Sequence, residues 1–316
     1  MMEAQRQAAR RLRLNRRERA PYRLAAILFT GPFLLLFFTF TILPILSSVV
    51  LSFTDFNMLQ KPSFVGMENY ISLLLEDDIF LIALRNTMIF ALITGPFSYM
   101  LSFVFAWFIS DFKRGLRTAL TFLFYAPSLA GNVYFIWTYI FSDDSAGFIN
   151  SMLLRMGVIR ESIYWLTDPS KNMTVVIVVI LWLSMSVGFL SFVAGLKSMD
   201  RSLYEAGAVD GVKNRFQELW YITLPQMVPQ LLFGAVMQIS TSFAVGYEAM
   251  SLTGFPSTDY STHTIVLHIL DYGAIRFEMG YASAIAVVLF LLMLVFWSLV
   301  KKVLHTFGGA EGGEAT

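Results

Sequence analysis

Six long apolar segments constrain this chain more than any other feature of its sequence. None of them carries Lys, Arg, Asp or Glu in its interior, and they cover residues 24–53, 87–109, 119–141, 173–193, 228–247 and 281–300. A helix needs about 20 mostly apolar residues to cross the roughly 30 Å hydrocarbon core of a bilayer. The sequence therefore predicts an all-α membrane protein with six transmembrane helices.

The composition excludes an ordinary soluble protein. Hydrophobic residues make up 56% of the 316 residues and charged residues 14%, and the mean hydropathy is +0.63. Soluble domains have about 45–50% apolar and about 25% charged residues. The chain has no cysteine, which excludes disulfides, thiolate zinc sites and cysteine nucleophiles. The first apolar segment is much longer than the roughly 7–15 residues of a signal-peptide core, so it is interpreted as a span.

The Lys and Arg residues are distributed unevenly between the loops. If the N-terminus is cytoplasmic, 17 of the 23 lie on the cytoplasmic side and 6 on the outer side. Cytoplasmic loops are enriched in Lys and Arg, so we expect both termini in the cytoplasm. The chain then divides into a basic cytoplasmic segment (1–23), a six-helix domain (24–305) and a flexible tail (306–316). Because the basic segment is short and adjoins a span, we expect it to contact membrane lipid and no nucleic acid.

The loop between the fourth and fifth segments, 197–225, combines charged and apolar residues in a distinctive order. It reads Ser-Leu-Tyr-Glu-Ala-Gly-Ala-Val-Asp-Gly at 202–211 and Tyr-Ile-Thr-Leu-Pro at 221–225. Gly adopts positive φ at little cost, so the pattern predicts a short helix, a reversal at Gly211 and a second amphipathic helix that stops at Pro225. Such a helix–turn–helix can insert into a groove of a partner.

This loop resembles the EAA loop of permease subunits of binding-protein-dependent ABC importers. The whole of 24–305 is similar to the sugar-importer permeases of the maltose and glycerol-phosphate group, through residues 51–53, 64–70, 165–169, 205–225 and 280–284. The resemblance implies the type I importer permease fold. It also implies a set of residues that couple the chain to an ATPase, namely Glu205, Ala206, Gly207, Asp210 and Gly211.

The chain departs from the family pattern at two places in this loop. Gly207 stands where the family has its second alanine, which is a mild change. The stretch from Gly211 to Ile222 is one residue longer than the usual spacing, which predicts that the second short helix is rotated or bulged.

The resemblance further implies the other members of a transport complex. These are a second homologous permease subunit, two ATP-binding cassette subunits and an extracellular solute-binding protein that docks on the long outer loops. The substrate would be a sugar or oligosaccharide, and the location would be the bacterial cytoplasmic (inner) membrane. The chain has no G-x-x-x-x-G-K-[ST] phosphate-binding loop, so we expect it neither to bind nor to hydrolyse ATP. As a translocation subunit it would be no enzyme and would bind no cofactor of its own. ATP and Mg would be used by the partner ATPase.

Polar and aromatic residues in the fourth and fifth segments are candidates for the substrate pathway. The candidates are Trp182, Ser184, Ser186, Gln238, Thr241, Ser242 and Glu248. Those from Gln238 onward fall close to helical spacing and form a polar stripe. Ser, Thr and Gln also hydrogen-bond between packed helices. A carboxylate such as Glu248 fits either a solvated helix end or a water-filled cavity, so both interpretations stay open.

Two other classes of protein compete with this hypothesis. An ion-coupled secondary transporter of a small polar solute usually carries ionisable residues inside its spans, and here the span interiors have none. An intramembrane enzyme needs a positioned base, nucleophile or metal set. The three histidines lie outside the spans, and His263 and His268 lack carboxylates at ligand spacing, so we expect no metal site.

Overall fold

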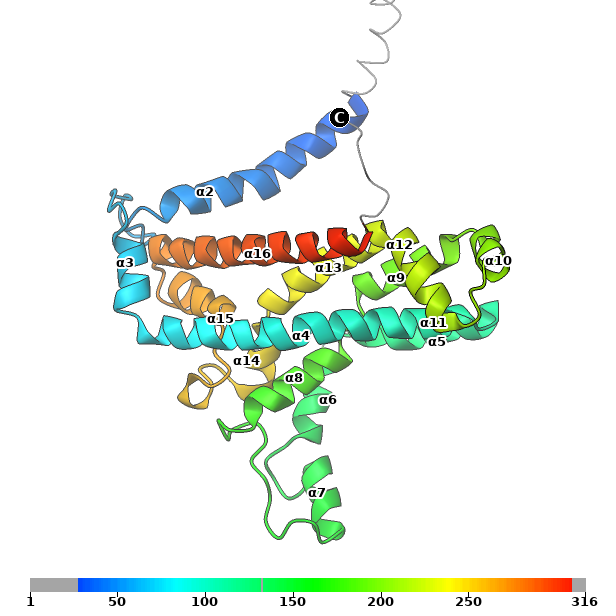
Figure 1. Ribbon diagram of the computed structural model, residues 1–316. Helices are drawn as coiled ribbons and strands as arrows, with labels where there is room; N and C mark the ends of the chain where they lie inside the picture. Colours follow the sequence, from blue (N-terminus) through cyan, green and yellow to red (C-terminus); the bar gives the residue numbers. More distant parts are fainter. Residues whose placement is uncertain (1–27, 132, 309–316) are drawn as a thin grey trace, which may run out of the picture.

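The computed structural model describes residues 28–131 and 133–308, so segment 1–23 and the end of the tail lie outside the described residues (Figure 1). The described residues form helices joined by loops, with one isolated antiparallel bridge between Thr54 and Phe64. Within this part of the chain, four helices are long and apolar enough to cross a membrane, and two bent helix pairs raise the number to six. The predicted all-α membrane fold is confirmed.

The helical elements follow one another along the whole described chain. In order they are η1 (Phe38–Ile42), α2 (Leu43–Leu51), α3 (Glu68–Leu75), α4 (Asp78–Ser110), α5 (Arg114–Leu129), α6 (Val133–Ile140), α7 (Phe148–Arg155), α8 (Asn172–Trp182), α9 (Val187–Ser198), α10 (Arg201–Val209), α11 (Arg215–Glu218), η2 (Leu219–Thr223), α12 (Leu224–Gln226), α13 (Val228–Phe243), α14 (Tyr247–Thr253), η3 (Thr258–Tyr260), α15 (Ile265–Leu270), η4 (Asp271–Ile275) and α16 (Met279–Gly308). The first span is a single helix, Leu28–Leu51, that includes η1 and α2.

Three of the four long helices are unbroken, although one starts earlier than expected; the fourth, Asn172–Ser198, contains the α8–α9 interruption. The first span, Leu28–Leu51, lies within the predicted segment, whereas α16 contains the predicted segment 281–300 and continues to Gly308, past the predicted start of the tail at residue 306. Helix α4 begins at Asp78 instead of residue 87. The Asp77 side chain accepts a hydrogen bond from Phe80 N at 2.8 Å, and such a cap satisfies a free N–H at a helix start. The helix therefore extends outward through its polar first turns.

The other three predicted spans are interrupted. The axis turns by 86° between α5 and α6, inside the predicted span 119–141, and by 80° between α12 and α13, directly before the predicted span 228–247. Helices α8 and α9 are separated at residues 183–186, and α13 ends at Phe243, before the predicted end at 247. Pro127, close to the end of α5, has no N–H to continue a helix. Irregular backbone at membrane depth is tolerated only where protein covers it or where it lines a water-filled cavity.

Small residues bring the central helices close together. Helix α13 packs against α4, α9 and α16 (Figure 1). A Cβ atom on Gly188 of α9 would lie 3.7 Å from Gly234 Cα of α13. A Cβ atom on Gly95 of α4 would lie 3.4 Å from Ser242 Oγ. Close approach of backbones at small residues is a typical way for helices to associate in lipid.

The first span stands apart from this bundle. Its apolar window has no buried residue, and its principal packing partner is α16 (Figure 1). An apolar helix that is exposed on most sides requires a surrounding of hydrocarbon or of another apolar protein surface.

The loop after the first span is held by hydrogen bonds from the 64–70 motif. Asn69 Nδ2 donates to Ser52 O at 2.9 Å and to Thr54 O at 2.8 Å, and Tyr70 Oη donates to Ser52 Oγ at 2.7 Å. Gly280 N, at the start of α16, donates to Phe56 O at 2.8 Å. Three of the segments that carry the family resemblance therefore meet at one end of the first span.

Asn150 organises the loop that contains the 165–169 motif. Its amide nitrogen donates to three carbonyl oxygens, those of Ser142, Asp144 and Ile163. Its oxygen accepts hydrogen bonds from Ile163 N at 3.2 Å and Trp165 Nε1 at 3.0 Å. The side chain is fully buried. It therefore ties α7 to the segment that leads into α8.

Candidate functional site

A cavity of about 190 Å³ lies where the interrupted spans meet. The residues that line it come from α4, from the α5–α6 break, from the α8–α9 break and from the end of α13 with the start of α14. They are Ser98, Pro127, Ser128, Ala130, Val133, Tyr134, Ile180, Leu183, Ser186, Gln238, Thr241, Ser242, Val245 and Glu248. The breaks in the helices thus line a polar cavity, as the cost of unsatisfied backbone in lipid requires.

Five of the seven pathway candidates line this cavity, namely Ser186, Gln238, Thr241, Ser242 and Glu248. Glu248 reaches the cavity by a different route from the one predicted, because it does not belong to the polar stripe of α13. Because α13 ends at Phe243, Glu248 belongs to α14. The chain turns at residues 244–246, and this turn brings the carboxylate back to the cavity beside the polar face of α13.

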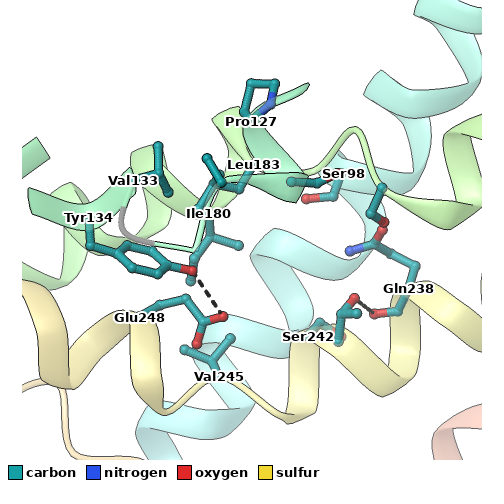
Figure 2. A pocket seen from close by; sticks show the side chains of 14 residues that line it. Ser98, Pro127, Val133, Tyr134, Ile180, Leu183, Gln238, Ser242, Val245 and Glu248 are labelled. Carbon is teal, nitrogen blue, oxygen red and sulfur yellow. Dashed lines mark hydrogen bonds between the residues drawn. The ribbon is translucent and has the colours of Figure 1, made fainter. Parts of the chain in front are cut away.

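Glu248 faces Tyr134 across one side of the cavity. Figure 2 shows these two side chains at one end and Ser98, Gln238 and Ser242 at the other. Tyr134 Oη donates to Glu248 Oε1 at 3.4 Å, and Gly246 N donates to Oε2 at 3.1 Å. Among the described residues that line the cavity, Glu248 is the only charged one. The carboxylate can accept further hydrogen bonds from a hydroxylated ligand.

Ser98, Ser128 and Tyr134 also line the cavity, and the sequence prediction did not include them. Ser98 is fully buried, and its Oγ has no hydrogen-bond partner among the described residues. A buried hydroxyl without a partner costs about 1–3 kcal/mol, so this group favours a site that takes up water or a polar ligand. The signal in the sequence is a hydroxyl side chain inside an apolar span.

Trp182 and Ser184 lie at the α8–α9 break but are not among the lining residues. The ring of Trp182 packs edge-on against Trp137, with centroids 5.2 Å apart. Ser184 is buried, and its carbonyl oxygen accepts from Ser102 Oγ at 3.0 Å. These contacts fix the backbone on either side of Leu183, which does line the cavity.

The 197–225 loop forms the helix–turn–helix that the sequence predicts. Asp200 caps α10 by accepting from Ser202 N at 3.0 Å. Glu205 and Ala206 are exposed on α10, and Asp210 is exposed at its C-terminal cap. Gly211 follows with a φ of 97°, a value that Gly adopts far more readily than other residues. The predicted reversal at Gly211 is confirmed.

The second half of the loop contains a π-helical turn. Asn214 caps α11 by accepting from Gln217 N at 2.9 Å, and η2 then runs over Leu219–Thr223. A π turn accommodates one residue more than an α-helical turn. The predicted bulge after Gly211 is therefore observed. The predicted stop at Pro225 is wrong, because the helix includes Pro225 and ends at Gln226, before the 80° bend into α13.

Two contacts lock the halves of the loop together. Tyr204 Oη and Thr223 Oγ1 are 3.0 Å apart. Gly207 lies against Ile222, whose Cδ1 would be 2.5 Å from a Cβ atom at position 207. Absence of a side chain at Gly207 therefore allows η2 to pack directly on α10.

Arg215 connects the loop to the end of α4. Its guanidinium forms an ion pair with Asp111 and lies 4.7 Å from the ring centroid of Trp107. These groups border a second cavity of about 590 Å³, which Glu205 also lines. Ion pairing and cation–π contact both hold the Arg215 side chain, so they connect α11 to the end of α4.

His263 and His268 lie away from both cavities in a buried chain of hydrogen bonds. Their Nε2 and Nδ1 atoms, respectively, are 3.2 Å apart, and His268 Nε2 is 3.0 Å from Asp77 Oδ2. Tyr272 and Tyr281 also donate to Asp77 Oδ2. Burial lowers the pKa of His263 to about 4. Among the described residues, no group of three or more His, Asp or Glu is placed to hold a metal ion.

Residues 98–305 match the model of one protein family, described as the binding-protein-dependent transport system inner membrane component. The matched region contains the residues of both cavities.

Curated relatives align over most of their length. The probable ABC transporter permease protein YesP of Bacillus subtilis is 31% identical, with 89% of each chain covered. The arabinooligosaccharides transport system permease protein AraP of Bacillus subtilis is 29% identical over 92% of this chain and 90% of that protein. The lactose transport system permease protein LacF of Rhizobium radiobacter is 30% identical over 85% and 90%.

A solved structure has the same fold. In the crystal structure of a bacterial alginate ABC transporter with a periplasmic protein bound to alginate pentasaccharide, one chain superposes with a TM-score of 0.72. It is 22% identical, and the match covers 91% of this chain and 96% of that chain.

Proposed function

This chain belongs to the family of inner membrane components of binding-protein-dependent transport systems, and we propose that it forms half of the translocation pathway of an ATP-driven importer for a sugar or oligosaccharide. It has the type I importer permease fold and is a multi-pass protein of the bacterial inner membrane. It is a translocation subunit and not an enzyme.

The cavity between the interrupted spans carries this proposal. Its lining combines hydroxyl groups, an amide, one tyrosine and one carboxylate with apolar side chains. Sugar hydroxyls both donate and accept hydrogen bonds, and Ser, Thr and Gln side chains can do the same. The assignment of Ser186, Gln238, Thr241, Ser242 and Glu248 to the pathway is part of the proposal. Trp182 and Ser184 would act by holding the break that positions the lining.

The names of relatives support a saccharide as the substrate. Arabinooligosaccharides and lactose occur in the names of two relatives at 29% and 30% identity. Selection among saccharides would rest largely with a separate extracellular binding protein, as the family description implies.

The 205–211 segment would couple the pathway to ATP hydrolysis. We place Glu205, Ala206, Gly207, Asp210 and Gly211 in a cleft of a cytoplasmic ATPase subunit. Closure of two such subunits on ATP and Mg would pull α10, and the contacts of Ile222 and Arg215 would carry the displacement to α13 and α4. The bundle would then exchange between inward-facing and outward-facing packings.

The proposed complex contains this chain, a second homologous permease, two ATP-binding cassette subunits and the extracellular binding protein. Both termini and the 197–225 loop would be cytoplasmic, since 17 of 23 basic residues then lie inside. The loops at 54–86, 142–172 and 248–280 would face outward and receive the binding protein. This chain would bind no cofactor of its own.

Purification from the native membrane tests the proposal. We expect this chain to be recovered in a stable complex with an ATP-hydrolysing subunit. Glu205→Lys, which reverses an exposed charge on α10, should reduce that recovery. A chain that purifies alone and transports solute in vesicles without ATP would contradict the proposal and favour an ion-coupled transporter.

A further inference from the structure

The charge of the cavity lining is asymmetric. Fourteen described residues line the cavity; one is a carboxylate and none is Lys, Arg or His. The hydrogen bonds of Glu248 come from Tyr134 Oη and Gly246 N, which are neutral donors. The carboxylate therefore lies in the cavity without a neutralising cation among the described lining residues.

Glu248 is held by the backbone that places it. Gly246 N donates to Oε2 two residues before Glu248 itself, at the start of α14. A Cβ atom on Gly246 would lie 2.6 Å from Val266 Cγ1, so this turn is packed closely against the next segment. The carboxylate is thus a fixed feature of the cavity wall rather than a side chain that swings toward bulk water.

We infer that Glu248 makes this half of the pathway selective against anions, so that the transported saccharide carries no negative charge and is neither a uronate, a sugar phosphate nor a sulfonate. The inference rests on the proposed function, because it concerns the same cavity. Two like charges a few ångströms apart repel strongly where water is partly excluded. A neutral saccharide meets no such repulsion, and its hydroxyls can donate to the carboxylate.

A second solved structure, which superposes with a TM-score of 0.72 and is 24% identical, is that of a bacterial ABC transporter involved in the import of the acidic polysaccharide alginate. At 24% identity the two chains share the arrangement of their helices. The charge of a cavity lining depends on individual side chains, which a shared fold does not determine. The negative charge at position 248 therefore predicts a different substrate class on the same scaffold.

The absence of cysteine from this chain allows a direct test. Two variants of the complete transporter in detergent, Thr241→Cys and Ser128→Cys, each place a single thiol of this chain in the cavity. The second variant serves as an independent reporter. The rates of modification by a cationic and an anionic methanethiosulfonate reagent are measured on this chain alone by mass spectrometry. Each rate ratio is then compared between Glu248 and Glu248→Gln at the same thiol, so intrinsic reagent reactivity cancels.

We expect Glu248→Gln to lower the cationic-to-anionic rate ratio by about tenfold. Glu248→Lys should lower it further. Glu161→Gln, which removes an exposed carboxylate from the loop after α7, is the matched control and should leave the ratio unchanged.

The outcomes separate this inference from the proposed function. If the thiols react but the cationic-to-anionic rate ratio is the same with Glu248 and with Glu248→Gln, the inferred charge selection is wrong. The proposed aqueous pathway is then unaffected. Thiols at both positions that react with neither reagent would overturn the aqueous pathway itself.

A binding screen tests the substrate class directly. The solute-binding protein encoded beside this chain is titrated with neutral oligosaccharides and with oligouronides and sugar phosphates of matched length. We expect a neutral saccharide to bind most tightly. A preference for an anionic saccharide would contradict the inference.

Discussion

Ile222 Cδ1 lies 2.5 Å from the point that a Cβ atom would occupy on Gly207. The two residues belong to the two halves of the 197–225 loop, and their contact packs the π turn at Leu219–Thr223 onto α10. The lack of a side chain at Gly207 makes room for Ile222, which the π turn presents to α10.

The effect of a substitution at Gly207 on ATP-dependent uptake should depend on how far the Ile222 side chain can move. We expect Gly207→Ala to have little effect, because the terminal methyl of Ile222 can move aside. Gly207→Val should reduce ATP-dependent uptake by about tenfold, since overpacking costs about 1–3 kcal/mol. The double variant with Ile222→Ala should recover most of the activity. Equal uptake by Gly207→Val and the wild type would show that this contact does not matter for coupling.

Glu205→Lys should abolish uptake while the chain still inserts into the membrane. Glu205 is exposed on α10 and lines the cavity beside Arg215, so reversal of its charge changes the proposed ATPase contact and not the bundle. Uptake is measured in vesicles and the amount of chain by immunoblotting. Undiminished uptake would argue against a docking role for this residue.

Gly280→Ala should destabilise the fold. A Cβ atom there would collide with the Thr54 carbonyl oxygen and lie 3.0 Å from Phe56 N. Both are backbone atoms, so neither can move without disrupting the loop after the first span. We expect a loss of about 2 kcal/mol, measured as a lower thermal unfolding midpoint. Gly115→Ala is the matched control, because nothing lies within 4 Å of its Cβ position.

Acidification should weaken the segment 248–280, which contains His263. Burial lowers the pKa of His263 from 6.5 to about 4, so the unfolded chain takes up a proton first as the pH falls. Stability from the neutral histidine is complete above about pH 6.5 and is lost progressively toward pH 4. The thermal unfolding midpoint should fall over this range. His263→Gln should make the fall shallower, and an unchanged slope would contradict this assignment.

The sequence predicted the spans and the helix–turn–helix of the 197–225 loop more successfully than the breaks in the helices. Hydropathy alone locates segments such as 281–300, because burial in lipid needs only apolar length. It does not show that α13 ends at Phe243, since Ala244, Val245 and Gly246 are as apolar as the helix before them. Glu248 was expected near the pathway through helical spacing, but it reaches the cavity through a turn. Tyr134 and Ser98 depend on tertiary contacts that spacing cannot reveal.

In the proposed complex this chain lines a pathway that a partner ATPase operates. The most direct test is uptake of a labelled oligosaccharide, identified by the binding screen, into vesicles that contain the complete complex, with the binding protein on the side of the outer loops. We predict uptake only when ATP and Mg are present on the side of the 197–225 loop, and its loss in Glu205→Lys. Uptake of equal rate without ATP would contradict the account.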